Sequence, residues 1–260
     1  MVTYQNYLVD VGPDKIALLT VNRPEKRNAM SAEAWRELEH FFAWADQAPE
    51  VGMVILTGAG NKAFIAGADL NSLAGRRPAD CLKNAAQSAL RRIERCAKPV
   101  IAAVNGYAFG GGCETAIACD FRVVSENAVF ALPETGLGII PGAGGTQRLS
   151  RLIGLGRAKD MVLLGRSVSG PEAVRIGLAT ACVPQEKLLE EARQMAAQML
   201  KRGPLALQMA KHLLQASLSS SEDVGLLMEN MAFGALCGTQ DKREGVMSFL
   251  EKRNPSYQGK

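Results

Sequence analysis

Short apolar runs alternate with polar segments along the first two thirds of the chain. The runs at 7–11 and 16–21 flank the turn residues Gly12–Asp14 and predict an antiparallel hairpin. Other apolar runs predict buried strands, at 51–57, 99–104, 121–124 and 128–132. Together with frequent glycines and few aromatic residues, this pattern favours the tight turns and packing of an α/β fold.

The segments between and after these runs carry apolar residues at helical spacing. Ser31 can cap a helix with an apolar stripe of Trp35, Leu38, Phe41, Phe42 and Ala45. A second helix has apolar positions at Ala86, Leu90, Ile93 and Ala97. Helices are expected from residue 153 onward, the last four at 185–201, 204–217, 221–237 and 240–252. Their apolar faces exceed what one small subdomain can bury, which predicts an oligomer interface.

Length and composition suit one large or one-and-a-half domain enzyme with a sizeable core. The chain has 260 residues, of which 47% are hydrophobic and 22% charged. We expect an α/β core at residues 1–195 and a helical oligomerisation region at residues 196–260. The formal net charge of +4 comes from interspersed acidic and basic residues, so it indicates neither a nucleic-acid partner nor a membrane partner.

The cysteines predict neither a zinc site nor a disulfide framework. The chain has six cysteines with no C-x-x-C pair and no histidine at metal spacing, which indicates free thiols in a reducing compartment. No run of about 18 apolar residues predicts a membrane span, and the amino terminus lacks a basic region followed by an apolar stretch. We therefore expect a soluble, cytoplasmic protein without a metal.

Candidate chemistry is concentrated in a glycine-rich stretch between residues 105 and 146. Gly110, Gly111 and Gly112 follow the apolar run at 99–104 and lead into a helix that begins with Glu114 in its first turn. Free N–H groups at that helix start could hold an oxygen that gains negative charge. An acid/base group beside such donors is what enolate chemistry needs. The alternative is a flexible turn whose glutamate only complements the helix dipole.

Several motifs together resemble the enoyl-CoA hydratase/isomerase (crotonase) superfamily. They are N-R-P-E-K-R-N-A at 22–29, K-A-F-I-A-G-A-D-L at 62–70, the glycine turn with Glu114, Glu134 after Pro133, and G-L-G-I-I-P-G-A-G-G-T at 136–146. The resemblance covers nearly the whole chain, up to F-L-E-K-R near its end. It implies a core built as a ββα superhelix, or spiral, followed by a C-terminal helical trimerisation region.

The resemblance also implies the residues of the site. Glu114 and Glu134 would be catalytic, and the N–H groups of Ala68 and Gly111 would form an oxyanion hole. Other positions would bind a coenzyme A thioester, at Lys26, Ala66, Asp69, Leu70, Gly142, Phe233 and Lys252. Asp69 would chiefly fix its own loop, while Phe233 and Lys252 would reach the coenzyme A of a neighbouring subunit in a dimer of trimers. No cofactor is implied, since coenzyme A belongs to the substrate.

The implied reaction is addition of water to a 2-trans-enoyl-CoA to give a 3-hydroxyacyl-CoA. Two glutamates distinguish this hydratase reaction from a double-bond isomerisation, for which one carboxylate suffices. Other acyl-CoA reactions of the superfamily use the same oxyanion hole, so the fold alone does not exclude them. An RNA-binding protein is the alternative outside enzymes, but the basic residues are neither clustered nor interleaved with aromatics. Chain length, branching or a ring in the acyl group would depend on residues 71–81 and the C-terminal helices.

Overall fold

The structure is a computed structural model that describes residues 3–69, 73–75 and 77–260. Its larger sheet has the strand order β1-β2-β3-β5-β7-β10. These strands are β1 (Tyr7–Val11), β2 (Ile16–Val21), β3 (Met53–Gly58), β5 (Val100–Val104), β7 (Phe121–Ser125) and β10 (Ala181–Val183). The β1–β2 pair is antiparallel, which confirms the predicted hairpin, and the other neighbours are parallel.

A second sheet lies beside the first and has the order β4-β6-β8-β9. Its strands are β4 (Ala63–Ile65), β6 (Tyr107–Phe109), β8 (Val129–Ala131) and β9 (Val168–Ser169). The chain passes from the first sheet to the second and then into helical structure three times, in the orders β3-β4-α4, β5-β6-α5 and β7-β8-α6. These turns form the spiral core that the resemblance implied.

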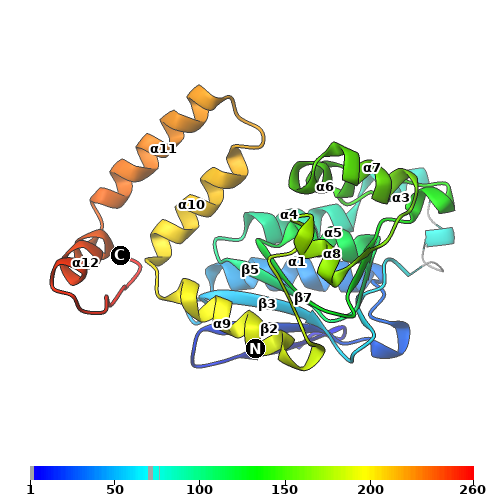
Figure 1. The fold of residues 1–260 in the computed structure, drawn as a ribbon, viewed down its shortest axis with the longest axis horizontal. Helices are drawn as coiled ribbons and strands as arrows, with labels where there is room; N and C mark the ends of the chain where they lie inside the picture. Colours follow the sequence, from blue (N-terminus) through cyan, green and yellow to red (C-terminus); the bar gives the residue numbers. More distant parts are fainter. Residues whose placement is uncertain (1–2, 70–72, 76) are drawn as a thin grey trace.

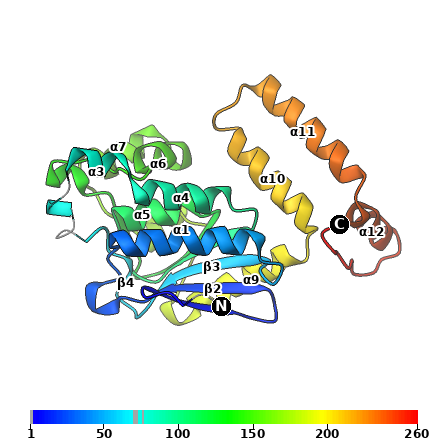
Figure 2. The ribbon, with the colours of Figure 1, turned by 180° about the vertical axis from the view of Figure 1, so that it is seen from behind.

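Helices cover both faces of the larger sheet (Figures 1 and 2). The core helices are α1 (Ala32–Gln47), α3 (Pro78–Leu82), α4 (Ala85–Arg95), α5 (Gly111–Ala118), α6 (Gly145–Ile153), α7 (Leu155–Leu163), α8 (Gly170–Arg175) and α9 (Leu188–Leu200). Alternate residues of β3 explain this layering. Val54 and Leu56 join the core cluster that contains α1 and α4, whereas Met53 and Ile55 pack with α9. Both faces of the strand are therefore buried, as its uninterrupted apolar sequence predicted.

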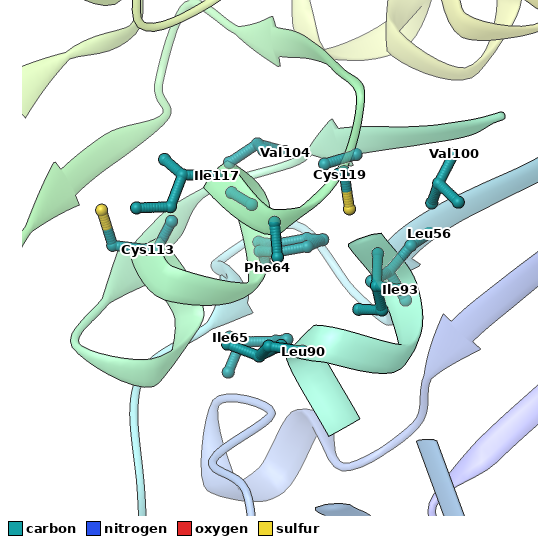
Figure 3. Close-up of a cluster of buried hydrophobic side chains, with 14 of the residues drawn as sticks. Leu56, Phe64, Ile65, Leu90, Ile93, Val100, Val104, Cys113, Ile117 and Cys119 are labelled. Atoms are coloured by element: carbon teal, nitrogen blue, oxygen red, sulfur yellow. The ribbon is translucent and has the colours of Figure 1, made fainter. Parts of the chain in front are cut away.

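The predicted start and apolar stripe of α1 are confirmed. The Ser31 side chain accepts a hydrogen bond from the Ala34 N–H at 3.1 Å, and the predicted apolar stripe of α1 is buried. In α4, Leu90 and Ile93 are buried as predicted, but Ala86 is only partly buried and Ala97 lies beyond the end of the helix. Figure 3 shows the side chains packed around α5 and α4, with Phe64 and Ile65 of β4 next to Leu90 and Ile93 of α4. This packing fixes the position of α5, whose amino-terminal end forms part of the candidate site.

Several short strands were not predicted. The glycine turn does not follow β5 directly, because β6 intervenes and carries the chain into the second sheet. Asn105 stabilises this transfer, since its Nδ2 donates to the carbonyls of Gly58 and Gly60, both at 2.8 Å. A Cβ at Gly106 would lie 2.3 Å from the Lys62 carbonyl oxygen, so the turn requires glycine. Strand β10 was not predicted either, and it pairs in parallel with β7.

The C-terminal helices extend away from the core (Figures 1 and 2). They are α10 (Pro204–Ala216), α11 (Glu222–Cys237) and α12 (Gln240–Leu250), and α11 mainly contacts the other two. Large apolar side chains are exposed on them, among them Leu214, Met231, Phe233 and Phe249. Helix α9 spans the expected boundary at 195/196 and packs on the sheet. Within the described residues, every helix is too short or too polar to traverse a lipid bilayer.

Candidate active site

The candidate site is built around the turn from β6 into α5. Gly110 has φ +52°, in a region that favours glycine, and its N–H donates to the Ala131 carbonyl of β8 at 2.9 Å. Gly111 begins α5, so its N–H belongs to the helix start that lacks internal partners. Within the described chain, no side chain or carbonyl accepts a hydrogen bond from this N–H.

A second loop brings Ala68 next to this turn. The residues on either side of Ala68 bond to Met30, because the Met30 N–H donates to the Gly67 carbonyl at 2.8 Å and the Asp69 N–H donates to the Met30 carbonyl at 3.0 Å. A Cβ at Gly67 would lie 3.3 Å from the Phe109 carbonyl oxygen, which shows how closely the two loops approach. The Ala68 N–H, like that of Gly111, has no acceptor among the described residues.

Glu114 is buried and held by backbone donors. Only 3% of the residue is exposed, and its Oε1 accepts hydrogen bonds from the N–H groups of Ala143 and Gly145, both at 2.8 Å. Burial raises the pKa of the Glu114 carboxyl, and the two N–H donors and the positive charge of Arg148 oppose that rise. The second oxygen, Oε2, has no hydrogen-bond partner among the described residues.

Glu134 reaches the same turn from the other side. It begins the short helix η2 (Glu134–Leu137), and its Oε1 lies 2.8 Å from the position that a Cβ at Gly110 would occupy. Its Oε2 is buried without a hydrogen-bond partner in the described chain. Burial raises the pKa of Glu134 to about 7; its own backbone N–H lowers the pKa and the negative charge of Glu114 raises it.

The arrangement combines two free backbone donors with two carboxyl groups of different environment. Donors at a helix start can stabilise an oxygen on which negative charge develops. A carboxyl with a pKa near neutrality can give a proton, while one held by N–H donors favours its ionised form. Cys113 lies next to Glu114 in sequence and is buried, and burial raises the pKa of its thiol, which disfavours the reactive thiolate form. The geometry therefore suits acid/base chemistry next to a carbonyl group.

Comparison with known proteins agrees with this geometry. The family model for enoyl-CoA hydratase/isomerase matches residues 12–260. This chain belongs to that family. It is 41% identical to the short-chain-enoyl-CoA hydratase of Clostridium acetobutylicum, over 92% of each chain, and 42% identical to the 2,3-dehydroadipyl-CoA hydratase of Escherichia coli, over 95% of this chain and 96% of that protein.

A solved structure shows that the fold is that of the crotonase family. The crystal structure of an enoyl-CoA hydratase from Bacillus anthracis matches with a TM-score of 0.94 and 40% sequence identity. The match covers 98% of this chain and 100% of that one. The expected family and fold class are thus confirmed, and the spiral of strands described above is a crotonase fold.

The residues expected to bind coenzyme A fall into two groups. Lys26 is exposed at the end of helix η1 (Pro24–Lys26), and this loop is joined to Ala66, whose N–H donates to the Arg27 carbonyl at 3.1 Å. Gly142 is exposed in the loop that holds Glu114, and its carbonyl accepts from Asn84 Nδ2 at 2.7 Å. These segments adjoin the two oxyanion donors or the glutamates.

Two other predicted positions lie away from this site within the chain. Phe233 is 68% exposed on α11, and Lys252 is exposed just after α12 with φ +54°. Both belong to the helices that extend away from the core. Leu70 lies outside the described residues. Asp69 follows Ala68 and helps to hold its loop through the backbone bond to Met30.

Sequence reasoning missed the donors that orient Glu114. They are backbone N–H groups at Ala143 and Gly145, so no side chain announces them. The only available signal is the glycine at position 145, because a Cβ there would lie 3.0 Å from Glu114 Oε1. Across the described residues, no three His, Cys, Asp or Glu side chains gather as metal ligands would.

Proposed function

We propose that this chain is an enoyl-CoA hydratase that adds water across the 2-trans double bond of an enoyl-CoA to give a 3-hydroxyacyl-CoA. The observation that carries this proposal is that Glu134 Oε1 lies against Gly110, while Glu114 lies in the first turn of the helix that Gly111 begins and its charge acts on Glu134. The names of relatives about 40% identical over nearly the whole chain support the same reaction.

The N–H groups of Ala68 and Gly111 would receive the thioester oxygen. Hydrogen bonds from both polarise the carbonyl and withdraw electrons from C3 of the conjugated double bond. Negative charge reaches the oxygen when the hydroxyl adds to C3, and the two donors stabilise that enolate. Loss of one such donor typically lowers the rate by about 10²–10³-fold. The absence of any protein acceptor for these N–H groups in the described chain supports this role.

The two carboxyl groups would supply the proton transfers. Glu114 accepts a proton from the water as its oxygen bonds to C3, and Glu134 gives a proton to C2. One water is consumed, and the two carboxyls return to their starting states by exchanging one proton between them or with solvent. The raised pKa of Glu134, about 7, supports its assignment as the acid, and the two N–H donors on Glu114 support its assignment as the base. Hydration changes no net oxidation state, so the proposal includes no redox cofactor.

Binding of the coenzyme A part would use several surfaces. Lys26 would pair with a phosphate, and the backbone near Ala66 would hold the adenine. Phe233 and Lys252 would come from a neighbouring subunit in a dimer of trimers. The exposed apolar side chains of α10–α12 support residues 196–260 as the oligomerisation region. A cytoplasmic location, expected from the cysteine content, stays a prediction.

The acyl group would be short and apolar. Ile139 and Ile140 are 41% and 67% exposed in the segment between Glu134 and Gly142, where they could face an acyl chain. Apolar side chains favour a crotonyl group over an acyl chain that ends in a carboxylate, because the carboxylate would lose hydration without a paired charge. Faster hydration of crotonyl-CoA than of 2,3-dehydroadipyl-CoA is therefore expected.

The test follows the ultraviolet absorbance of the conjugated thioester of crotonyl-CoA. Rapid loss is expected with the parent, and a fall of at least about 10²-fold with either Glu114→Gln or Glu134→Gln. A 3-enoyl-CoA serves as the second substrate, since an isomerase would convert it and a hydratase would not. Tight binding of crotonyl-CoA without hydration, or loss of activity in only one glutamate variant, would refute a hydratase that uses both carboxyls.

A further inference from the structure

An arginine side chain contacts the loop that holds Glu114. Arg148 of α6 donates from Nη1 to the Ala143 carbonyl at 2.8 Å. The N–H of the same residue, Ala143, donates to Glu114 Oε1 at 2.8 Å. Arg148 and Glu114 are thus joined through the backbone of one residue.

The other nitrogens of Arg148 are fixed by Glu94 of α4. Nε donates to Oε1 at 3.1 Å and Nη2 donates to Oε2 at 2.9 Å, which makes the pair bidentate. The side chains are only 14% and 24% exposed. Two hydrogen bonds to one carboxylate fix the orientation of the guanidinium better than a single hydrogen bond would. The third nitrogen, Nη1, is therefore aimed at the Ala143 carbonyl.

Two further features of this loop concern its fit to Arg148 and its contact with helix α4. Gly144 has φ +110°, and a Cβ there would lie 2.1 Å from Arg148 Nη1, so only glycine leaves room for the guanidinium. Asn84, at the start of α4, holds the neighbouring Gly142 carbonyl from the other side at 2.7 Å. Helix α4 therefore contacts the loop directly through Asn84 and indirectly through the Glu94–Arg148 pair.

Glu94 offsets the positive charges that surround Arg148. Both line a cavity of about 740 Å³ whose other charged residues include Arg91, Arg95 and Arg151, and among the described lining residues Glu94 is the only acidic one. Without Glu94, the Arg148 guanidinium would face like charges and would lose the contact that sets its orientation.

We propose that Arg148 is a positioning residue, which fixes the Glu114 carboxylate through the backbone of Ala143 and is itself oriented by Glu94. The proposal rests on the proposed function only for its kinetic readout. Loss of the arginine would let the loop move, and a small misplacement of a catalytic group can cost about 10²-fold in rate. The substrate itself does not touch Arg148 in this scheme, so KM should change little.

The test compares Arg148→Gln, Arg148→Lys and Glu94→Gln with the control Arg151→Gln. Arg151 is exposed on the same helix and donates only to Gln147 among the described residues. With crotonyl-CoA, we expect kcat to fall about 10²-fold in Arg148→Gln and to fall clearly in Glu94→Gln, and KM to stay near the parental value. Arg151→Gln should retain the parental kcat. The kinetic assays are run at a temperature at which circular dichroism shows that every variant is folded.

The pH dependence separates positioning from loss of stability. The charged and titratable groups around Glu114 are Glu134 on η2, Cys113 on α5 and Arg148 on α6, with Glu94 on α4 behind Arg148. Removing the positive charge makes ionisation of Glu114 harder, so the acid limb of kcat should move to higher pH in Arg148→Gln. Arg148→Lys keeps the charge and should leave that limb near its parental position.

Amide exchange gives a readout that needs no activity. The N–H groups of Ala143 and Gly145 should exchange faster in Arg148→Gln than in the parent, measured by deuterium uptake of a peptide that spans residues 141–147. An inactive parent with faster exchange in Arg148→Gln would refute the hydratase but uphold the positioning role. Unchanged exchange, or a kcat within about twofold of the parent in folded Arg148→Gln, would refute the positioning role.

Discussion

The raised pKa of Glu134 predicts how kcat/KM depends on pH. Burial and the charge of Glu114 raise it to about 7, and the proposed acid acts only when protonated. Roughly half of the molecules would carry this proton at pH 7, about one tenth at pH 8 and about one hundredth at pH 9. The kcat/KM for crotonyl-CoA should therefore fall about tenfold per pH unit above neutrality.

The assay is the initial rate of absorbance loss at a low crotonyl-CoA concentration, because kcat/KM reports the free enzyme. Glu114→Gln provides the internal check. This change removes a negative charge that raises the pKa of Glu134, so the pKa of Glu134 should move downward. Carbon NMR of labelled glutamate side chains can follow that titration even where the rate is small. A kcat/KM that stays flat to pH 9, or an alkaline limb that persists in Glu134→Gln, would refute the assignment of Glu134 as the acid.

Two further predictions concern stability. Gly112→Ala should destabilise the protein by about 1–3 kcal/mol in urea unfolding, because a Cβ there would lie 1.9 Å from the Ile65 carbonyl oxygen; Gly156→Ala in α7, with nothing within 4 Å, should be neutral or stabilising. Lys211→Met should cost about 3–5 kcal/mol, because it removes the ion-pair partner of the largely buried Asp120 carboxylate, now 2.7 Å from Lys211 Nζ, and leaves it the hydrogen bond from the Val100 N–H. Equal stability of the two glycine variants, or an unchanged urea midpoint in Lys211→Met, would contradict these estimates.

Local patterns predicted the parts of the fold that depend on local physics. The hairpin, the capped α1 and the strands buried on both faces follow from turn residues, capping and periodicity, and the structure confirms them. The short strands β4, β6 and β10 were missed. Three residues are too few for a periodic signal, and each becomes a strand because a distant segment pairs with it, as Cys182 pairs with Val124.

The spiral could not be found as a sequence repeat. Its three turns begin at Met53, Val100 and Phe121, so their spacing is irregular. The turns are equivalent in the order of sheet, sheet and helix, but segments of different length connect them. Only the resemblance to a known family therefore predicted the spiral, whereas the hydropathy pattern predicted the class of fold.

The candidate site was predictable where a side chain carries the chemistry. Glu114 was identified from its position after the glycines, since that placement has a physical reason. Its orientation depends on N–H groups of Ala143 and Gly145 and on the reach of Arg148, all about thirty residues further on. Backbone donors exist at almost every residue, so a sequence does not show which of them will point at a given carboxylate.

The close neighbours of the three glycines at 110–112 argue against the hypothesis of a flexible turn. Gly110 adopts φ +52° and leaves room for Glu134 Oε1, and Gly111 lies against Trp35, whose Cζ2 would be 3.1 Å from an added Cβ. Gly112 is pressed against the Ile65 carbonyl. Each position is constrained by a different neighbour, so the glycines permit close packing, and that packing fixes the turn against which Glu134 Oε1 lies. In this turn glycine therefore fixes the candidate oxyanion donor in place because it is small.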